Sequence, residues 1–424
     1  MVRAIVGSAA VVPVWQRAGV RSTGPDEDQF TLAIEALRWL GSSALAAPPK
    51  KGLEPHVWAV GDFDPTSDWR FGEALGAPGL AVLRTTANDS EPLLSALMEA
   101  IAPATSARTD FVVAAVAGDE SSPAAPRYGA GAVAFEVGPR PGIVLEGPPP
   151  WVPLPSSFTR TTSRFGSTPF LSIAEELFEL VQDRGPGYES ALPLSGGLAS
   201  AKLSVRLQAP IPWKGAWTEV VPMIPSPTAF TDPSPSVLRV SEGAYVPYPT
   251  YRENLPSRWR LEGERCTACD HIGFPVRGVC RQCGRSDRLV PYPFPRSGLT
   301  VSASTVVQPG AQPTEFDPQV QKTGGYGVVI VELVPGLRAT LQVTDHLGPA
   351  LAIGSRVDTC LRRIYSMEGE WRYGLKAVAR SGAPPFDRAA PPSAAPFEKD
   401  RPRRARRRST LPVSRKARDR PHKA

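Results

Sequence analysis

Apolar residues in the first 138 positions fall into two kinds of pattern. Continuous apolar runs are typical of strands buried in a sheet, and apolar positions three and four apart are typical of amphipathic helices. We predict strands at 3–14, 56–60, 80–84, 111–116 and 129–137, and helices at 31–40 and 91–101. Because strands and helices alternate, this region indicates an α/β layer architecture.

The pattern changes at Pro148-Pro149-Pro150, which marks a domain boundary. Beyond it, residues 172–183 have helical spacing, and residues 194–208 predict a turn followed by a strand. Residues 210–235 are rich in proline and serine. The region 151–244 is therefore either a shortened second half of the first domain or a linker region, and the sequence leaves both alternatives open.

Strand patterns return in the C-terminal part, after a short helix predicted at 251–259. Five apolar or alternating runs predict strands at 299–307, 326–334, 337–344, 356–364 and 371–378. Five strands are the number found in the OB-fold, a Greek-key barrel. The segment 308–325 is rich in proline and glycine and is then the loop between the first two strands, where such barrels often bind ligands.

Four of the five cysteines form two pairs with metal-ligand spacing, Cys266-x-x-Cys269 and Cys280-x-x-Cys283. Four thiolates at tetrahedral angles suit zinc in a structural ribbon, and metal binding then supplies the folding energy of so short a module. A rubredoxin-like iron site and two disulfides are the alternatives, although an intracellular chain rarely keeps disulfides. Because four thiolates fill the shell, we expect His271 to be a surface residue rather than a ligand.

The C-terminal part resembles the zinc-ribbon plus OB-fold proteins called acyl-CoA-associated. The resemblance covers both the ribbon and the barrel, and its segments are RLEGERCTACDHIGFPVRGVCRQCG, GLTVSASTVV, YGVVIVELVPGLRATLQVTD and IGSRVDTCLRRIY. Val276 and Arg281 replace prolines that are common in that family. The resemblance implies pairing with a thiolase or a 3-hydroxy-3-methylglutaryl-CoA (HMG-CoA) synthase, in which such proteins bridge subunits and help hold the CoA end of an acyl-CoA.

The N-terminal part resembles the thiolase superfamily, most of all its HMG-CoA synthase branch. The segments that carry it are DEDQFTLAIEALRWL, TTANDSEPLLSALMEAIA, DFVVAAVAGDE and YGAGAVAFEVG. The resemblance implies a nucleophilic cysteine near Asn88 and catalytic histidines further on, but the first cysteine is Cys266 and no histidine lies between His56 and His271. We therefore expect no catalytic residues in this domain. An unrelated α/β domain remains the alternative.

Charge and composition separate the tail from the rest. The net charge is +7, yet the segment 381–424 contains thirteen Lys/Arg and four Asp/Glu, which is +9, so the segment 1–380 sums to −2. The tail lacks apolar periodicity and is expected to be disordered. No apolar run approaches the roughly 20 residues that cross a bilayer. The apolar start is interpreted as a first strand rather than a signal peptide, which predicts a cytoplasmic protein.

These observations predict a thiolase-like α/β domain, shortened if 151–244 is a linker, followed by a zinc ribbon, a five-stranded OB-type barrel and a disordered basic tail. The expected domains are 1–150, 151–244, 245–296 (a helical arm and the ribbon), 297–380 (the barrel) and 381–424. The predicted function is that of a non-catalytic scaffold with structural zinc, in a hetero-oligomer with a thiolase or HMG-CoA synthase-type enzyme of lipid metabolism. CoA or acyl-CoA is expected at the interface with that partner.

Two other functions stay open. The first is single-stranded nucleic-acid binding by the ribbon and barrel, for which Tyr326, Tyr365, Trp371 and Tyr373 would supply stacking rings. The −2 charge of the chain outside the tail argues against it except through the tail. The second is a divergent acyl-CoA acyltransferase. Cys360 lies in a strand pattern and is expected to be a buried thiol, and Asp345-His346 is interpreted as turn residues.

Overall fold

The computed structural model describes most of residues 3–146, four short strands between 152 and 216, and residues 246–379 apart from 347–349 and 368–369. These residues belong to one compact unit, Met1–Arg388. The helix predicted at 172–183, the capping residues before 91, Asn88 and the tail 381–424 lie outside the described residues.

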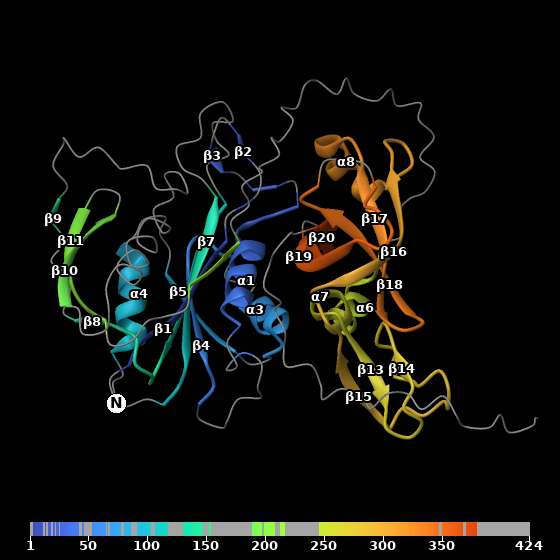
Figure 1. Cartoon of the computed structure of the whole chain (residues 1–424), viewed down its shortest axis with the longest axis horizontal. Helices are drawn as coiled ribbons and strands as arrows, with labels where there is room; N and C mark the ends of the chain where they lie inside the picture. Colours follow the sequence, from blue (N-terminus) through green and yellow to red (C-terminus); the bar gives the residue numbers. More distant parts are fainter. Residues whose placement is uncertain are drawn as a thin grey trace, which may run out of the picture. The chain divides into compact units, whose positions relative to one another are not determined.

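The N-terminal part forms a ten-stranded mixed sheet (Figure 1). Strand β1 lies between β7 and β8, both antiparallel to it, while β4 pairs in parallel with β5 and β6. All residues of β1, β6 and β7 are buried, as expected of strands covered on both faces. The sheet order is β10 (Glu189–Gly196), β11 (Ala199–Leu207), β8 (Ile143–Glu146), β1 (Ala4–Val11), β7 (Gly131–Gly138), β6 (Asp110–Val116), β4 (His56–Val60) and β5 (Ala81–Thr85), with β12 (Trp213–Ala216) beside β1 and β9 (Val152–Pro153) beside β11.

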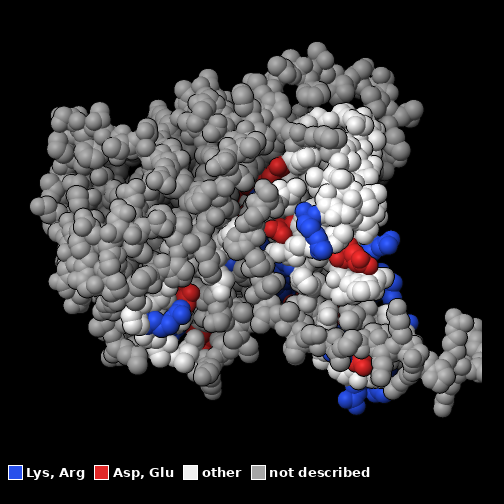
Figure 2. Space-filling view, in the orientation of Figure 1, with Lys and Arg blue, Asp and Glu red and all other residues white. Residues whose placement is uncertain are grey.

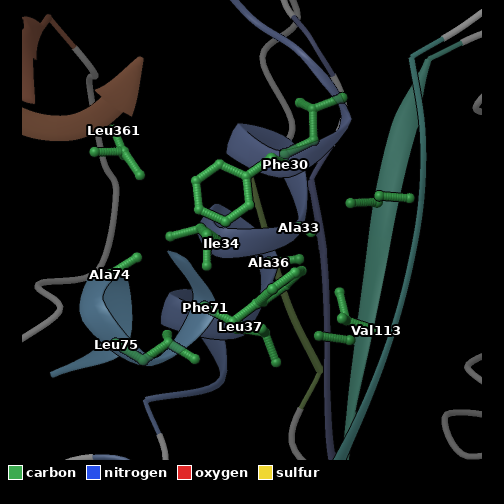
Figure 3. Close-up of a cluster of buried hydrophobic side chains, with 14 of the residues drawn as sticks. Phe30, Ala33, Ile34, Ala36, Leu37, Phe71, Ala74, Leu75, Val113 and Leu361 are labelled. Atoms are coloured by element: carbon green, nitrogen blue, oxygen red, sulfur yellow. The ribbon is translucent and has the colours of Figure 1, made fainter. Parts of the chain in front are cut away.

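Among the described residues, three helices accompany this sheet: α1 (Gln29–Leu40), α3 (Asp68–Leu75) and α4 (Glu91–Ile101). Helix α1 begins at Asp28, whose carboxylate accepts from the Thr31 N–H while the Thr31 hydroxyl accepts from the Asp28 N–H, and ends at Gly41 in the left-handed region. Figure 3 shows side chains of α1 and α3 packed together, and Leu361, from the C-terminal part, belongs to the same core cluster. A small hairpin, β2 (Gln16–Arg17) and β3 (Val20–Arg21), precedes α1.

The helical arm and the ribbon follow in the C-terminal part. The expected single helix at 251–259 is two short helices, α6 (Tyr248–Glu253) and α7 (Leu255–Arg260), which meet at Asn254 because Pro256 favours a new helix start there. The ribbon sheet has the order β14 (Ile272–Gly273), β13 (Glu262–Cys266), β15 (Leu289–Pro293). A side chain at position 263 would collide with the Gly273 carbonyl, so the close approach of β13 and β14 requires glycine there.

The last five strands form a closed barrel. The first three have the predicted bounds and the last two are longer than predicted. The barrel core contains Val301, Val329, Val331 and Leu375. The segment 308–325 is not a plain loop, because it contains the 3-10 turn η2 (Thr314–Phe316) and the helix α8 (Asp317–Thr323). The barrel order is β16 (Leu299–Val307), β17 (Tyr326–Val334), β18 (Leu337–Thr344), β20 (Glu370–Val378) and β19 (Arg356–Met367), which closes on β16.

Candidate functional site

The structure brings the four cysteines of the ribbon together. Their sulfur atoms all lie within 4.8 Å of one another, with Cys266 Sγ 3.6 Å from Cys283 Sγ and Cys269 Sγ 3.5 Å from Cys280 Sγ. All four are free thiols, so the disulfide alternative is not formed. Zinc–sulfur bonds at tetrahedral angles place sulfurs about 3.8 Å apart, which is near the observed separations. The ribbon therefore has four cysteines positioned to bind a metal.

Both cysteine pairs are shaped by the same backbone hydrogen bonds. After the first pair, the Asp270 N–H donates to the Cys266 carbonyl at 2.8 Å, and the Cys266 N–H donates to the His271 carbonyl at 2.9 Å. In the second pair, the Gly284 N–H donates to the Cys280 carbonyl at 2.8 Å. Gly284 has φ +76°, a conformation that glycine adopts without strain. The spacing of two residues thus folds into two equivalent turns that aim sulfurs at one point.

The thiols of the ribbon differ in pKa. The Cys283 N–H hydrogen bond lowers the pKa of the Cys280 thiol to about 7. At Cys269 the His271 N–H also favours the thiolate, but burial and the neighbouring thiols together raise the pKa to about 12. Four thiolates cannot coexist at this distance without a cation, because like charges this close oppose ionisation. A divalent metal would take the place of those protons.

The second turn of the ribbon is held by residues outside the cysteine set. The buried Glu264 carboxylate accepts from the Arg277 and Gly278 N–H groups, each at 3.2 Å. The Ser257 hydroxyl of α7 accepts from the Val276 N–H at 2.9 Å and donates to the Glu262 carbonyl at 2.8 Å. His271 is half-buried and contributes its backbone rather than its ring to the first turn. These bonds connect the metal-ligand turns to β13 and to the helical arm.

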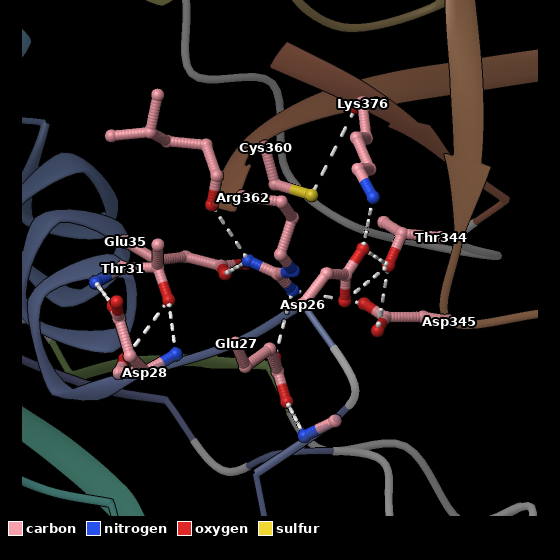
Figure 4. A network of polar contacts seen from close by, with 12 residues as sticks. Asp26, Glu27, Asp28, Thr31, Glu35, Thr344, Asp345, Cys360, Arg362 and Lys376 are labelled. Atoms are coloured by element: carbon pink, nitrogen blue, oxygen red, sulfur yellow. Dashed lines mark hydrogen bonds and ion pairs between the residues drawn. The ribbon is translucent and has the colours of Figure 1, made fainter. Parts of the chain in front are cut away.

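A buried ionic cluster joins the start of α1 to the barrel (Figure 4). Arg362 of β19, with a side chain 1% exposed, forms ion pairs with Glu27 at 2.9 Å, Glu35 at 3.0 Å and Asp345 at 3.0 Å. Lys376 of β20, whose side chain is fully buried, pairs with Asp26 at 2.8 Å. We call these six residues, Asp26, Glu27, Glu35, Asp345, Arg362 and Lys376, the ionic cluster.

The ionic cluster contains more acids than bases, namely four carboxyl groups and two cations. Burial therefore raises the pKa of Glu27 to about 8, against the pull of Arg362, and Asp345 raises it further. At Asp26 burial has the same tendency, but Lys376 and Arg362 outweigh it and lower the pKa. The raised pKa favours the protonated form of Glu27, whose carboxyl oxygen accepts from the Gly24 N–H at 2.8 Å.

Aromatic residues connect the helical arm to β20 and to the start of α1. The Trp259 indole N–H donates to the Tyr251 hydroxyl at 3.0 Å and to the Tyr373 carbonyl at 2.9 Å. The Tyr373 hydroxyl donates to the Asp28 carboxylate at 2.8 Å. Burial is the main cause that raises the pKa of Tyr373, and the negative charge of Asp28 raises it further. Trp259 is fully buried, and its ring lies 6.1 Å from that of Phe30. The α/β layer and the C-terminal part therefore share one core.

Other residues singled out in the sequence have different positions. Cys360 is buried, as predicted, and His346 is exposed at a turn while Asp345 belongs to the ionic cluster. Of the four rings considered for nucleic-acid stacking, Tyr326, Tyr365 and Tyr373 are buried and Trp371 is 39% exposed. Three of these rings are thus not available to stack on bases.

Sequence reasoning missed the ionic cluster. Its one signal is a charged residue within an apolar strand pattern, as at Arg362 and Lys376, together with the acidic run at 26–28. A charge in such a strand is expected to have a partner when buried. The acidic partners from the α1 region lie near the opposite end of the sequence, so the pattern alone does not identify them.

Comparisons with known proteins agree with the ribbon. A family described as "ChsH2, rubredoxin-like zinc ribbon domain" matches residues 257–290. The chain is 30% identical over 125 residues to a "DUF35 domain-containing scaffold protein" of Methanothermobacter thermautotrophicus, covering 29% of this chain and 89% of that protein. A protein of the same description from Methanocaldococcus jannaschii is 30% identical over 125 residues, which are 29% of this chain and 84% of that protein.

Solved structures give weaker similarities. An "Ltp2-ChsH2(DUF35) aldolase" structure is 21% identical and covers 28% of this chain and 84% of that chain, with a TM-score of 0.21. An HMG-CoA synthase, PksG of Bacillus subtilis, is 14% identical and covers 46% of this chain and 56% of that chain, with a TM-score of 0.28. Within the described residues, no helix is both long and apolar enough to cross a membrane.

Proposed function

The chain belongs to the family of DUF35 domain-containing scaffold proteins, and from this premise we propose that it is a non-catalytic accessory protein of a thiolase- or HMG-CoA synthase-type acyl-CoA enzyme. It binds structural zinc through Cys266, Cys269, Cys280 and Cys283. Its ribbon and arm contact the partner enzyme, and its barrel helps hold the CoA end of an acyl-CoA at the shared interface. The site of action is the cytoplasm.

The convergence of the four cysteines carries this proposal. They lie in the segment matched by the ribbon family, and their sulfur separations suit a tetrahedral metal. Zinc rather than iron is favoured because such closed four-thiolate ribbons have a purely structural role for the metal, which is what a scaffold requires. The metal would hold the two turns together and thereby fix β13 relative to α7.

The architecture supports the rest of the proposal. The closed barrel with the order β16-β17-β18-β20-β19 has the five strands of an OB-type barrel. The N-terminal sheet and its helices are compatible with a thiolase-like domain that lacks the cysteine and histidines of a condensing enzyme. The boundaries 1–150, 151–244, 245–296, 297–380 and 381–424 remain part of the proposal, as does a disordered tail.

Metal analysis of the purified chain tests the first part. We expect one zinc per chain, measured by plasma mass spectrometry. Cys280→Ser removes a ligand and should abolish stoichiometric zinc, whereas Cys360→Ser alters a buried barrel thiol and should retain it. Iron in place of zinc, or equal metal loss in both variants, would contradict the assigned ligand set.

Partner capture tests the second part. The full chain, expressed with an affinity tag in its native host, should co-purify with an enzyme that carries the thiolase-type cysteine and histidine. The pair should bind CoA more tightly than the chain alone. A chain that stays alone and turns over acyl-CoA would instead support the acyltransferase alternative. Saturable binding of single strands that survives deletion of 381–424 would support the nucleic-acid alternative.

A further inference from the structure

Four arginines and three aromatic rings alternate in space where α3, the helical arm and β20 meet. The Arg252 guanidinium lies over the Trp69 ring at 3.7 Å and 6.0 Å from the Tyr248 ring. Arg70 lies 5.7 Å from the Trp69 ring, and Arg372 lies 4.8 Å from the Tyr248 ring. We call the set the arginine ladder; its order is Arg70, Trp69, Arg252, Tyr248, Arg372, Tyr251 and Arg258.

The arginine ladder has an excess of positive charge. Among the described residues, Glu370 is the one carboxylate in an ion pair with it, 3.1 Å from Arg372, and the Glu370 side chain is 54% exposed. Arg372 itself is 2% exposed, yet its Nε has no hydrogen-bond partner, and neither does the buried Nε of Arg258. In the part of the chain that the structure describes, the four arginines therefore have one ion pair among them, from Arg372 to the half-exposed Glu370 carboxylate.

The chemistry of stacked guanidinium groups limits what can bind there. A ring below a guanidinium satisfies its face and leaves the N–H groups along its edge free to donate. Those edges form a planar fork that fits the paired oxygens of a phosphate or carboxylate. Tyr248, 38% exposed, opens the middle of the ladder to solvent, and Arg70 and Arg252 are half-buried beside it. An anion at this position would offset the repulsion between the guanidinium groups.

We infer that the arginine ladder is a binding site for the phosphate groups of a small diphosphate-containing ligand. A ligand with several anionic oxygens can bind several arginines of the ladder at once, which a single carboxylate cannot do. The identity of the ligand rests on the proposed function, because the CoA end of an acyl-CoA carries such a diphosphate.

A small ligand is favoured over a nucleic acid. The segment 1–380 sums to −2, so the fold lacks the extended basic surface that follows a nucleic-acid backbone. The ladder is local and combines a few elements: α3 contributes Trp69 and Arg70, the arm contributes Tyr248 and Arg252, and β20 contributes Arg372. Such a site holds a few phosphates rather than a strand.

Calorimetric titration of the full chain with inorganic pyrophosphate tests this inference. We expect saturable binding that weakens as salt rises. Arg252→Gln should raise the dissociation constant at least tenfold, and Arg252→Lys should weaken binding as well because it keeps the charge but loses the fork. Arg265→Gln is the matched control, since Arg265 is an exposed ribbon arginine already paired with Asp270, and it should leave binding unchanged. CoA should compete with pyrophosphate, because both present a diphosphate to the same arginines.

Several results would overturn the inference. The first is absence of pyrophosphate binding to the wild-type chain at millimolar concentration, which would leave the ladder a purely structural contact. The second is an equal loss of pyrophosphate affinity in Arg252→Gln and Arg265→Gln. The third is preferential binding of a single-stranded oligonucleotide. Because the titration uses the chain without a partner, it can fail while enzyme capture succeeds, or succeed while capture fails.

Discussion

Arg362 is the centre of the ionic cluster, and its replacement gives the sharpest test of how the two parts of the chain are joined. Arg362→Met keeps most of the volume and removes the cation shared by Glu27, Glu35 and Asp345. Removing one partner of a buried pair costs about 3–5 kcal/mol because it leaves an uncompensated buried charge. Glu35 and Asp345 lose this cation together, whereas the raised pKa of Glu27 limits the charge on the third carboxyl group, so we expect a loss within that range.

Urea unfolding at pH 7.5, followed by far-ultraviolet circular dichroism, measures this loss. Arg363→Met is the matched control. Arg363 is the next residue of β19, but it has one long ion pair, 3.9 Å from Asp28, and its guanidinium otherwise stacks over the Trp371 ring at 4.5 Å, so we expect a smaller loss of about 1–2 kcal/mol. The deficit of Arg362→Met should shrink toward pH 5 as the orphaned carboxyl groups take up protons. Equal losses in the two variants, or a deficit independent of pH, would refute the reasoning.

Three further predictions concern the same junction. The pKa of Glu27 is raised from 4.5 to about 8, so its contribution to stability is complete below about pH 4.5 and is lost as pH rises through 8. The urea concentration at the unfolding midpoint should therefore decrease less between pH 6 and 9 in Glu27→Gln than in the wild-type chain. Trp259→Phe removes two hydrogen bonds and should lower the free energy of unfolding by about 1–3 kcal/mol in the same assay. Asp28→Ala removes both the cap of α1 and the acceptor of the buried Tyr373 hydroxyl, so it should cost about 2–4 kcal/mol, with faster amide exchange in the first turn of α1.

Features encoded by neighbouring residues were predictable from the sequence. The cysteine spacing identified the ribbon, because a turn of two residues fixes where the sulfurs lie. The barrel strands β16, β17 and β18 have the predicted bounds because their apolar patterns end at glycine or proline turns. The same reasoning found α1, whose capping residues are adjacent to its apolar face.

Features that depend on distant residues were not predictable in the same way. Helix α3 was missed because Gly72 and Arg70 dilute its apolar spacing, and its buried residues face Phe30 of another helix. The segment 308–325 differs from the predicted loop because Pro313 and Pro318, which indicate turns in a sequence, here precede or open a helical turn. The arginine ladder joins three elements and has no sequence pattern of its own.

The junction also bears on where a partner enzyme would bind. The face of β19 and β20 that carries Arg362 and Lys376 is covered by this chain's own α1 region, so a partner cannot use it without displacing the ionic cluster. The ribbon differs, since Val279 is 48% and Val290 43% exposed there, and Figure 2 shows both basic and acidic residues on the described surface. Under the proposed function, a partner enzyme would contact a surface other than this face, such as the ribbon, while the contact with α1 fixes the barrel within the chain.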